Sequence, residues 1–576
     1  MRLRWSMNLA KKIKLAKKLY GVDVSARETD RSVVLTGSCN DWQTVVAVGK
    51  LFVNKRGGKH VVNDMTSDGF VEPAERLPLV SDNSLDGTSW DVVIVGGGVS
   101  GCAVARELAR YDIRVLLCEK HSDVAHGASG ANDGMVHAGI DLAHPCKKLH
   151  YVVKGNAMYG DLCRDLGVEF TREGQYVVFG SKLIKTLAAT YLLRAKRHKI
   201  PGVTIVNRKG IVGLEPSVDG YAVGALKVPS TGAVSPYKLT IALAENAVQN
   251  GVTISFNTAV TGFVRDSFGI TDVVTNRGTV SAKCVVNAAG VFADKIAELA
   301  DDRYFSIHPR KGVDLILDPD GDGLPTHSIS LAPTLKTLKA NKNTKGGGIV
   351  KTVDGNILLG PNAVETPFRE DTSTTATDVA TVFDKQQACC HTLDRRQIIA
   401  YFAGVRACTY EEDFLIERSS KVRNLVHVAG IQSPGLTAAP AFVPDVAQLA
   451  VECLAEQGVD VRLNANFNPK RVKPVCTREL SDKELDALVE ADPDFGTVIC
   501  RCERVTLGEI KAAINNPLGV ATVDGVKRRV RAGMGRCQGG FCMPQIVKII
   551  AEETGKGYAE VNKSDDGSYM AVNKYE

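Results

Sequence analysis

The sequence predicts an α/β protein whose central region contains a Rossmann-type nucleotide-binding domain. An apolar run at residues 91–95 leads directly into the glycine-rich turn at 96–101, and a helix-like segment follows. A second apolar run, at 113–118, ends at Glu119. The strand-like segments between residues 90 and 465 are continuous apolar runs without alternation, which is typical of sheets covered on both faces.

Length and composition indicate a globular protein of several domains. The chain has 576 residues, and a single core seldom grows beyond about 250–300 residues. It is 44% hydrophobic and 24% charged, with a net charge of +6. This small excess does not indicate nucleic-acid binding, which requires cations concentrated on one face. It contains no apolar run of about 18 residues or more, so no membrane-spanning segment is expected.

Residues 1–70 are expected to form a small α/β module with the order helix, strand, helix, strand. Apolar residues recur at helical spacing among five lysines between residues 9 and 20. We interpret this segment as the first helix of the module, with a solvated basic face. Contact with anionic lipid and an organelle-targeting peptide are the alternatives.

The segments VVLTGSCNDWQ and GGKHVVND of this module resemble the BON domain of periplasmic and membrane-associated proteins. That resemblance implies binding or assembly, not catalysis. Residues 71–89 contain two prolines and a glycine among polar residues, as expected of a linker. After the large region at 90–465 we expect a second linker at 466–496, a cysteine-rich module at 497–556 and a loosely packed polar tail at 557–576.

Each part of the glycine-rich turn has a physical role in binding a dinucleotide. Gly96 permits the tight turn, Gly98 lets the backbone approach a pyrophosphate, and Gly101 lets helix and strand pack closely. The helix N-terminus offers free N–H groups and a partial positive charge to the phosphates. Glu119 would accept hydrogen bonds from the adenosine ribose, which argues against a 2′-phosphate there. The motif predicts dinucleotide binding but leaves FAD and NAD open.

The segment HSDVAHGASGANDGMVHAGID, directly after Glu119, resembles the glycerol-3-phosphate dehydrogenase and 2-hydroxyglutarate oxidase branch of the D-amino-acid-oxidase-like flavoproteins. The family's further motifs follow in order: STGAVSPYKLTIALAENA (230–247), VVNAAGVFAD (285–294), HPRKG (308–312), TKGGGIV (344–350), GVRACTYEEDFLIE (404–417) and GIQSPGLTAAPA (430–441). The resemblance implies an FAD domain interleaved with an α+β substrate domain that contains an antiparallel sheet. It also implies that Ser129, Gly435 and Leu436 contact the flavin.

By the same resemblance, the family oxidises a CH–OH or CH–NH bond by sending hydride to flavin N5. His137 lies where related glycerol-3-phosphate oxidases have their proposed base, and an imidazole titrates near neutrality. Arg406 matches a substrate-binding arginine, whose planar fork suits phosphate or carboxylate. Lys345 matches an active-site lysine. Arg310 and Lys311 are alternative ligands for the phosphate.

Fifteen cysteines are present, and eleven are scattered without the spacing of a disulfide framework. They are expected to be reduced, mostly buried thiols of a cytoplasmic protein. The tempting Cys389-Cys390-His391 sequence lies in a helix-like polar stretch, and we assign it a packing role.

Cys500, Cys502, Cys537 and Cys542 differ from the other cysteines because they form a Cys-x-Cys and a Cys-x4-Cys pair. Four thiolates complete the ligand set of a 2Fe-2S cluster. Structural zinc is the alternative, although it usually takes Cys-x2-4-Cys pairs. The segments CRCERVTLGEI and RRVRAGMGRCQGGFC resemble the small helical bacterioferritin-associated-ferredoxin-like domain, as found in the large subunit of the anaerobic glycerol-3-phosphate dehydrogenases. The cations at 527–536 are interpreted as offsetting the cluster's negative charge, not as binding nucleic acid.

The leading hypothesis is therefore an FAD-dependent dehydrogenase that converts glycerol 3-phosphate to dihydroxyacetone phosphate and passes electrons to a 2Fe-2S cluster. Its expected partners are the anionic substrate and an electron-acceptor protein or quinone-linked subunits, with at most peripheral contact with the inner membrane. The alternatives are a 2-hydroxyglutarate dehydrogenase or oxidase and a non-catalytic electron-transfer subunit. Electron acceptor and oligomeric state are left open.

Overall fold

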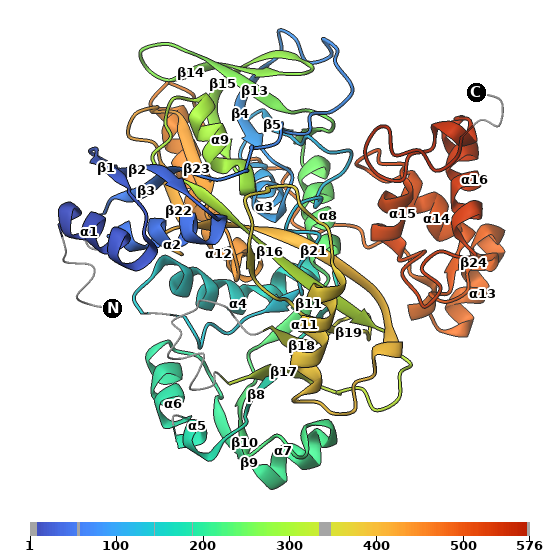
Figure 1. The fold of residues 1–576 in the computed structure, drawn as a ribbon. Helices are drawn as coiled ribbons and strands as arrows, with labels where there is room; N and C mark the ends of the chain where they lie inside the picture. The colour runs from blue at the N-terminus through green and yellow to red at the C-terminus, as the bar shows by residue number, and fades with distance from the viewer. Residues whose placement is uncertain (1–7, 55–57, 143, 187, 333–346, 573–576) are drawn as a thin grey trace.

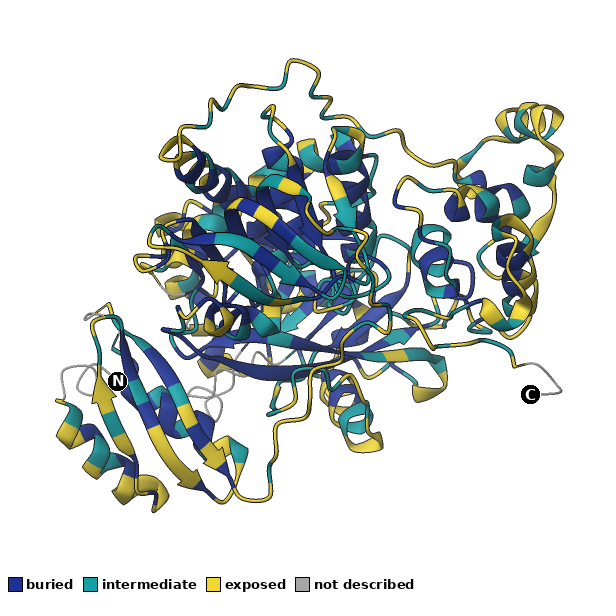
Figure 2. Ribbon diagram, turned by 90° about the horizontal axis from the view of Figure 1, so that it is seen from above, coloured by how far each residue is buried: buried dark blue, intermediate teal, exposed yellow. Residues whose placement is uncertain are grey.

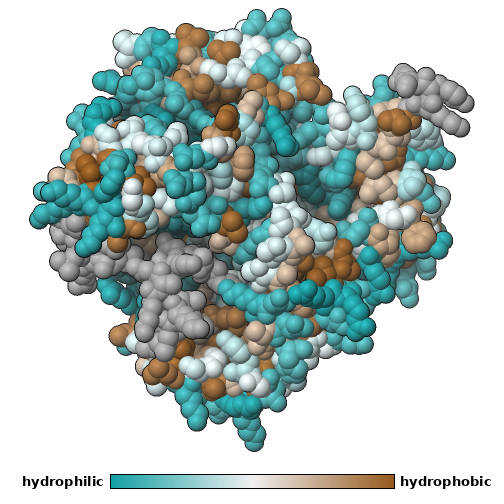
Figure 3. Space-filling view, viewed as in Figure 1, coloured by the Kyte–Doolittle hydropathy of each residue, from teal (hydrophilic) through white to brown (hydrophobic). Residues whose placement is uncertain are grey.

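The computed structural model describes residues 8–54, 58–142, 144–186, 188–332 and 347–572. Two interleaved domains form the body of the molecule, a small module packs on one side, and a helical domain lies on the other (Figure 1). On the face seen in Figure 3, apolar side chains form small separate groups, and a recess separates the C-terminal domain from the body. This arrangement confirms the predicted α/β class and the interleaving.

The N-terminal module has five elements: α1 (Leu9–Tyr20), β1 (Ser25–Glu28), β2 (Ser32–Cys39), α2 (Trp42–Phe52) and β3 (His60–Ser67). Strand β2 pairs in parallel with β3 and antiparallel with β1. The edge strand β1 was not predicted, because its sequence SARE is polar and mostly exposed and so carries no strand pattern. The resemblance to a BON domain stays a prediction.

This module packs against the body through buried contacts. The ring of Tyr410 lies in the module's own apolar core, and its hydroxyl accepts a hydrogen bond of 2.7 Å from Asn63. Arg31 forms an ion pair of 2.9 Å with the buried Asp302. Exposed residues gather on the outer surface of the module, away from this contact (Figure 2). The module is therefore one side of the folded body, not a freely tethered unit.

The nucleotide-binding domain is built on an eight-stranded sheet. Its parallel strands are β12 (Thr253–Ser255), β5 (Val115–Cys118), β4 (Ser89–Val95), β15 (Gly278–Asn287) and β23 (Leu425–Ala429); β13 (Val260–Arg265), β14 (Ile270–Thr275) and β22 (Leu415–Arg418) run antiparallel to their neighbours. One face is covered by α3 (Val99–Leu108), α4 (Lys147–Leu166), α8 (Pro236–Gln249) and α12 (Gly435–Ala455). Helix α9 (Ala293–Leu299) packs on the other face. The carboxyl ends of β4 and β5 deliver the glycine-rich turn and Glu119 to one edge.

The substrate domain contains a nine-stranded, mostly antiparallel sheet. Its strands are β8 (Gln175–Phe179), β9 (Thr204–Asn207), β10 (Gly224–Val228), β16 (Ile307–Leu317), β17 (Ser328–Leu331), β18 (Gly348–Lys351), β19 (Ile357–Gly360), β20 (Val364–Glu365) and β21 (Ile398–Thr409). The long pair of β16 and β21 places Arg310 opposite Arg406, and Gly312 opposite Gly404. A small sheet of β6 (Met135–Val136), β7 (Phe170–Thr171) and β11 (Gly232–Val234) joins the two domains, while α5 (Lys182–Thr186), α6 (Ala188–Arg197), α7 (Arg208–Leu214) and α11 (Ala376–Gln387) lie at the periphery.

The C-terminal domain is small and helical, as predicted. It contains α13 (Asp482–Ala491), β24 (Val498–Cys500), β25 (Val505–Thr506), α14 (Leu507–Ile514), α15 (Val523–Val530) and α16 (Met543–Thr554). The prediction of a loosely packed tail at 557–576 is wrong for residues 564–568, which are held against the nucleotide-binding domain. Ser122 donates to Ser564 and to Asp565 there, at 3.0 and 2.9 Å.

Helix α12 is the one described helix long and apolar enough to cross a membrane. It belongs to the main core, where Phe442, Val446 and Ala450 are fully buried against α3 and α4. Its apolar composition is therefore explained by packing within the protein. Cys389 and Cys390 are likewise buried in the core of the substrate domain, in agreement with their expected packing role.

Candidate functional site

A cavity of about 1940 Å³ runs between the nucleotide-binding and substrate domains. Its lining includes the predicted residues of both halves of the site: Gly96, Gly98, Glu119, Ser129, His137, Arg406, Gly435 and Leu436. Two segments more than 300 residues apart in the chain therefore face one enclosed space. Lys345 lies outside the described residues, so its predicted role stays a prediction.

The glycine-rich turn leaves no room for side chains. Gly96 adopts φ +107°, a conformation that L-residues rarely take. A Cβ on Gly101 would lie 1.9 Å from the carbonyl oxygen of Gly96, so only glycine lets α3 approach β4 this closely. The turn is therefore a cradle of bare backbone at a helix N-terminus, which fits a pyrophosphate.

Two side chains complete the cradle. The carboxylate of Glu119 accepts a hydrogen bond of 2.5 Å from the Gly97 N–H and another of 2.9 Å from the His121 N–H. The hydroxyl of Ser129 accepts from the Val99 N–H at 2.9 Å, at the first turn of α3. These contacts hold both side chains at the entrance to the turn, where the adenosine ribose and the phosphates of FAD would lie.

At the opposite end of the cavity, α12 begins at Gly435. The carbonyl of Leu436 accepts a hydrogen bond of 2.6 Å from the buried Tyr159 hydroxyl, which fixes the first turn of the helix. The side chain of Thr437 accepts from the backbone N–H of His137 at 2.9 Å. The structure thus places His137 beside a helix N-terminus, whose partial positive charge favours negative charge in the cavity.

Arg406 projects from β21 across the sheet. Its guanidinium donates to the Asn362 carbonyl at 3.1 Å. On the neighbouring strand β16, a Cβ on Gly312 would lie 2.2 Å from the Arg406 Nη2 atom, so this glycine provides the space that the guanidinium occupies. The alternative phosphate ligands are engaged elsewhere: Arg310 pairs with Glu365 and Glu412 at 3.0 and 2.5 Å, and Lys311 pairs with Asp371 at 2.8 Å.

Asp314, on β16, is a lining residue that sequence reasoning missed. Its side chain is fully buried, and its Oδ1 atom has no hydrogen-bond partner among the described residues. Burial raises the pKa of this carboxyl group well above its ordinary value; Asp133 adds to the effect and Arg406 opposes it. The sequence did contain a signal for a buried carboxyl group, because Asp314 stands among apolar residues in the segment VDLIL (313–317).

The four predicted cluster cysteines lie together in the C-terminal domain as two pairs. Cys500 and Cys542 are buried and are hydrogen-bond partners, whereas the sulfur atoms of Cys502 and Cys537 lie 3.6 Å apart near the surface. Burial raises the pKa of the Cys542 thiol to about 12. Backbone N–H groups of residues 539–541 outweigh burial at Cys537 and hold the pKa of that thiol below its ordinary value.

This geometry distinguishes between the two metal centres considered from the sequence. A zinc ion that held four thiolates at about 2.3 Å would bring every pair of sulfurs within about 4 Å. Within the described part of the chain, one set of three or more metal-ligating side chains has all its ligand atoms within 4.8 Å of one another, and it contains no cysteine. Two separate pairs of thiols instead suit the two irons of a 2Fe-2S cluster.

The basic run beside the cluster has a role that the sequence did not show. Its arginines pair with carboxylates of the body: Arg529 with Asp123 at 2.8 Å and Arg531 with Asp354 at 2.8 Å. Arg536 also pairs with Asp318, at 2.5 Å. Because these contacts cross between domains, the run docks the cluster domain on the body of the molecule, and compensation of cluster charge stays a prediction.

Comparisons with known proteins agree with this geometry. Residues 91–449 match the model of the FAD dependent oxidoreductase family, and residues 498–552 match that of the BFD-like [2Fe-2S] binding domain. A glycerol 3-phosphate dehydrogenase from Caloramator mitchellensis is 38% identical over 482 residues, which are 84% of this chain and 98% of the relative. The anaerobic glycerol-3-phosphate dehydrogenase of Escherichia coli has one subunit that is 27% identical, over 81% of this chain and 88% of its own length.

Among solved structures, the dithionite-reduced L-alpha-glycerophosphate oxidase from Mycoplasma pneumoniae with FAD bound is 28% identical. It superposes with a TM-score of 0.61 over 66% of this chain and 98% of the oxidase. The N-terminal module, residues 8–67, lies outside both family matches. The predicted cofactors, FAD and a 2Fe-2S cluster, are therefore confirmed, and the chain belongs to the FAD-dependent oxidoreductases of the glycerol-3-phosphate dehydrogenase family.

Proposed function

We propose that this enzyme oxidises sn-glycerol 3-phosphate to dihydroxyacetone phosphate. The observation that carries the proposal is that His137 and Arg406 line the same cavity as the dinucleotide-binding turn. Bound FAD supplies the acceptor for the hydride that leaves C2 of the substrate. The substrate thereby loses two electrons and two hydrogens, one as hydride and one as the proton of its C2 hydroxyl group.

The chain's own residues account for the binding of substrate and for the movement of that proton. Arg406 is held by Asn362 at the cavity wall, and its planar fork matches the oxygens of a phosphate. The imidazole of His137 would take the hydroxyl proton as the hydride leaves. With FAD and substrate bound, the cavity would hold less water, which would strengthen both interactions.

The cluster domain gives the electrons a way out of the flavin domain. The Escherichia coli relative is one subunit of an anaerobic dehydrogenase, and we propose that this chain likewise delivers electrons to partner subunits. Cys502 and the neighbouring Phe541, which is 82% exposed, would face that partner. Such a complex would work on the cytoplasmic side of the membrane, in peripheral contact with it.

Anaerobic addition of sn-glycerol 3-phosphate to the purified holoenzyme tests the substrate. The flavin absorbance near 450 nm should bleach, with 2-hydroxyglutarate at the same concentration as the matched control. Bleaching by 2-hydroxyglutarate alone would overturn the proposal in favour of a 2-hydroxy-acid dehydrogenase. Absence of bleaching by either compound would favour a non-catalytic role in electron transfer.

Two variants test the assigned roles in the same assay. His137→Asn should slow flavin reduction by about 100-fold or more with little change in substrate affinity, because it removes only the proton acceptor. Arg406→Met should instead raise the substrate concentration needed for half-maximal reduction by about 10–100-fold. Equal effects on rate and affinity in both variants would contradict this division of labour.

A further inference from the structure

The adenosine end of the FAD cavity has walls that come from neither matched domain. Linker residues 75–79 and tail residues 564–566 and 568 line it, beside His121. Both segments lie outside the family matches at 91–449 and 498–552. They also touch each other, because a Cβ on Gly567 would lie 3.2 Å from the Leu79 Cδ1 atom.

Three consecutive residues after Glu119 anchor the two segments. Lys120 holds the linker through an ion pair of 3.2 Å with Glu75. His121 and Ser122 hold the tail: the His121 Nδ1 atom lies 2.8 Å from the Asp565 carboxylate, and the Ser122 N–H donates to it at 2.9 Å. Because Glu119 marks the adenosine ribose, these anchors lie immediately beside the nucleoside.

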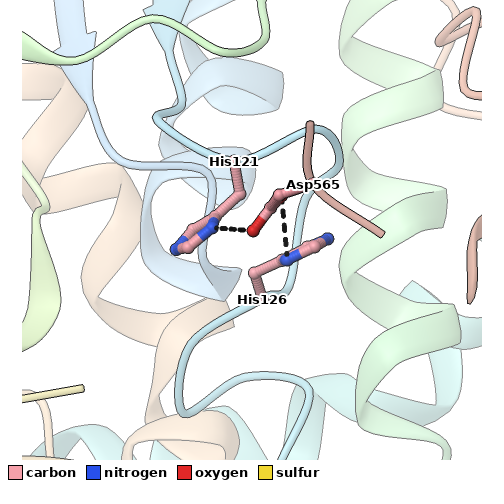
Figure 4. A group of neighbouring side chains, drawn as sticks. All are labelled: His121, His126 and Asp565. Atoms are coloured by element: carbon pink, nitrogen blue, oxygen red, sulfur yellow. Dashed lines mark hydrogen bonds and ion pairs between the residues drawn. The ribbon is translucent and has the colours of Figure 1, made fainter. Parts of the chain in front are cut away.

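Figure 4 shows how the tail is gripped. The carboxylate of Asp565 bridges the Nδ1 atoms of His121 and His126, at 2.8 and 3.6 Å, and the two rings stack with centroids 4.8 Å apart. The three side chains could be taken for a metal site. However, Arg528 lies 2.6 Å from the Nε2 atom of His126, which leaves the Nδ1 atom as the proton-bearing side toward Asp565. The guanidinium of Arg528 would repel a metal cation bound here. We therefore interpret the two histidines and Asp565 as an anchor for the tail.

The same loop connects the cluster domain to the phosphate-binding turn. Arg528 donates to the Val124 carbonyl at 3.2 Å, and Arg529 pairs with the fully buried Asp123 at 2.8 Å. Ala125, which follows Val124, donates its N–H to the carbonyl of Gly97 at 3.0 Å. Helix α15 of the cluster domain therefore contacts the loop at 123–125, and this loop in turn contacts the glycine-rich turn.

The side chains over this end suit an aromatic base. Leu77 and Leu79 line the cavity and yet are 52% and 74% exposed. The flat face of a bound adenine would cover these two leucines, and burial of their apolar surface would stabilise the complex. The tail adds Ser564, Asp565, Asp566 and Ser568 to the lining of the same cavity.

We propose that residues 75–79 and 564–568 form a two-part clasp over the adenosine of bound FAD, so that FAD retention depends on the docked cluster domain. This inference rests on FAD as the cofactor and not on the identity of the substrate. By linkage, FAD binding stabilises docking of the cluster domain by the same factor. The clasp would keep the flavin bound through many cycles of electron transfer.

Release of FAD from the full-length holoenzyme tests the clasp. Asp565→Ala and His121→Ala should each raise the FAD dissociation rate at least about tenfold, measured as flavin fluorescence in the ultrafiltrate after dilution. The double variant should release FAD no faster than Asp565→Ala alone, because Asp565→Ala already removes the contact with His121. Lys563→Met is the matched control, since Lys563 anchors the same tail only to Asp524 within the cluster domain, at 2.7 Å.

FMN lacks the adenosine and separates a clasp from a general loosening of the fold. Apo-enzyme carrying Asp565→Ala should bind FMN as tightly as the wild type but FAD at least about tenfold more weakly. Equal weakening of FMN and FAD, or FAD release within twofold of the wild type, would overturn the proposal. Glu75→Gln, which leaves the tail untouched, tests the linker half if Asp565→Ala does not fold, and should also accelerate release of FAD alone.

Discussion

The two cofactor sites of this enzyme are built in opposite ways. The flavin cavity collects residues from distant parts of the chain, from the linker at 75–79 to the tail at 564–568, and its phosphate-binding turn depends on glycines that leave no room for side chains. The predicted ligands of the cluster all come from 43 residues, 500–542, and one of them, Cys502, is exposed at the surface. The difference follows from their tasks: hydride transfer needs an enclosed space from which water is excluded, whereas electrons can leave through a cluster close to a partner.

Because the predicted thiolate ligands lie in the cluster domain, away from its docking contacts with the loop at Asp123, the cluster should be removable while the domain stays docked and the flavin stays bound. The largest effect is expected from Cys502→Ser together with Cys537→Ser, which removes one complete pair of thiolates. The visible and EPR signals of the cluster should disappear entirely, while FAD content and flavin bleaching by substrate should persist. Cys476→Ser, a cysteine of the same region outside the two pairs, is the control and should keep the cluster. Loss of FAD in the double variant would contradict this expectation and would show that the cluster itself is needed to keep its domain docked.

The reciprocal change affects the flavin alone. Gly101→Ala would place a methyl group 1.9 Å from the Gly96 carbonyl, so the turn must open and FAD affinity should fall by about 100-fold. Gly127→Ala is the matched control, because a Cβ on that cavity-lining glycine meets open space. Titration of apo-enzyme with FAD measures both affinities, and the cluster signal should be retained. Equal affinity in the two variants would show that the tight turn is not needed.

The smallest expected effect concerns the buried carboxyl group of the flavin cavity. The folded-state pKa of Asp314 is raised, so its contribution to stability is fully present below the unfolded pKa and is lost as the pH rises. Asp314→Asn removes this loss and should therefore become more stable relative to wild type as the pH increases from 5 to 8, by at most about 1.4 kcal/mol per unit. Thermal unfolding of apo-enzyme at several pH values measures the difference. Asp161→Asn, on an exposed helix face, serves as the control, and a pH-independent difference for Asp314→Asn would contradict a raised pKa.

The same contrast explains what could be predicted from the sequence. The four cysteines and the turn from Gly96 to Gly101 are local patterns whose chemistry depends on residues close together in the chain. His137 and Arg406 required the family resemblance, and the structure then placed both on one cavity. Their roles as base and phosphate ligand stay predictions.

The missed features all depend on pairing between distant segments. Asp314 becomes a cavity residue only because β16 pairs with β21, and the strand β1 exists only because β2 offers it an edge. The arginines of α15 looked like a local response to the cluster, yet Asp123, about 400 residues earlier, is the partner of Arg529. The tail was expected to be loosely packed because its composition is polar. Its contacts with His121 and His126 could not be inferred from that composition.

Rapid mixing of the holoenzyme with sn-glycerol 3-phosphate in the absence of oxygen tests the central claim, that one chain oxidises this substrate at its flavin and relays the electrons to its cluster. Absorbance of the flavin and EPR of the cluster would be followed in the same reaction. We expect the flavin to bleach first and the reduced-cluster signal then to rise with a lag. A flavin that bleaches while the cluster never becomes reduced would contradict the relay, and a flavin that is not reduced at all would contradict the proposed reaction.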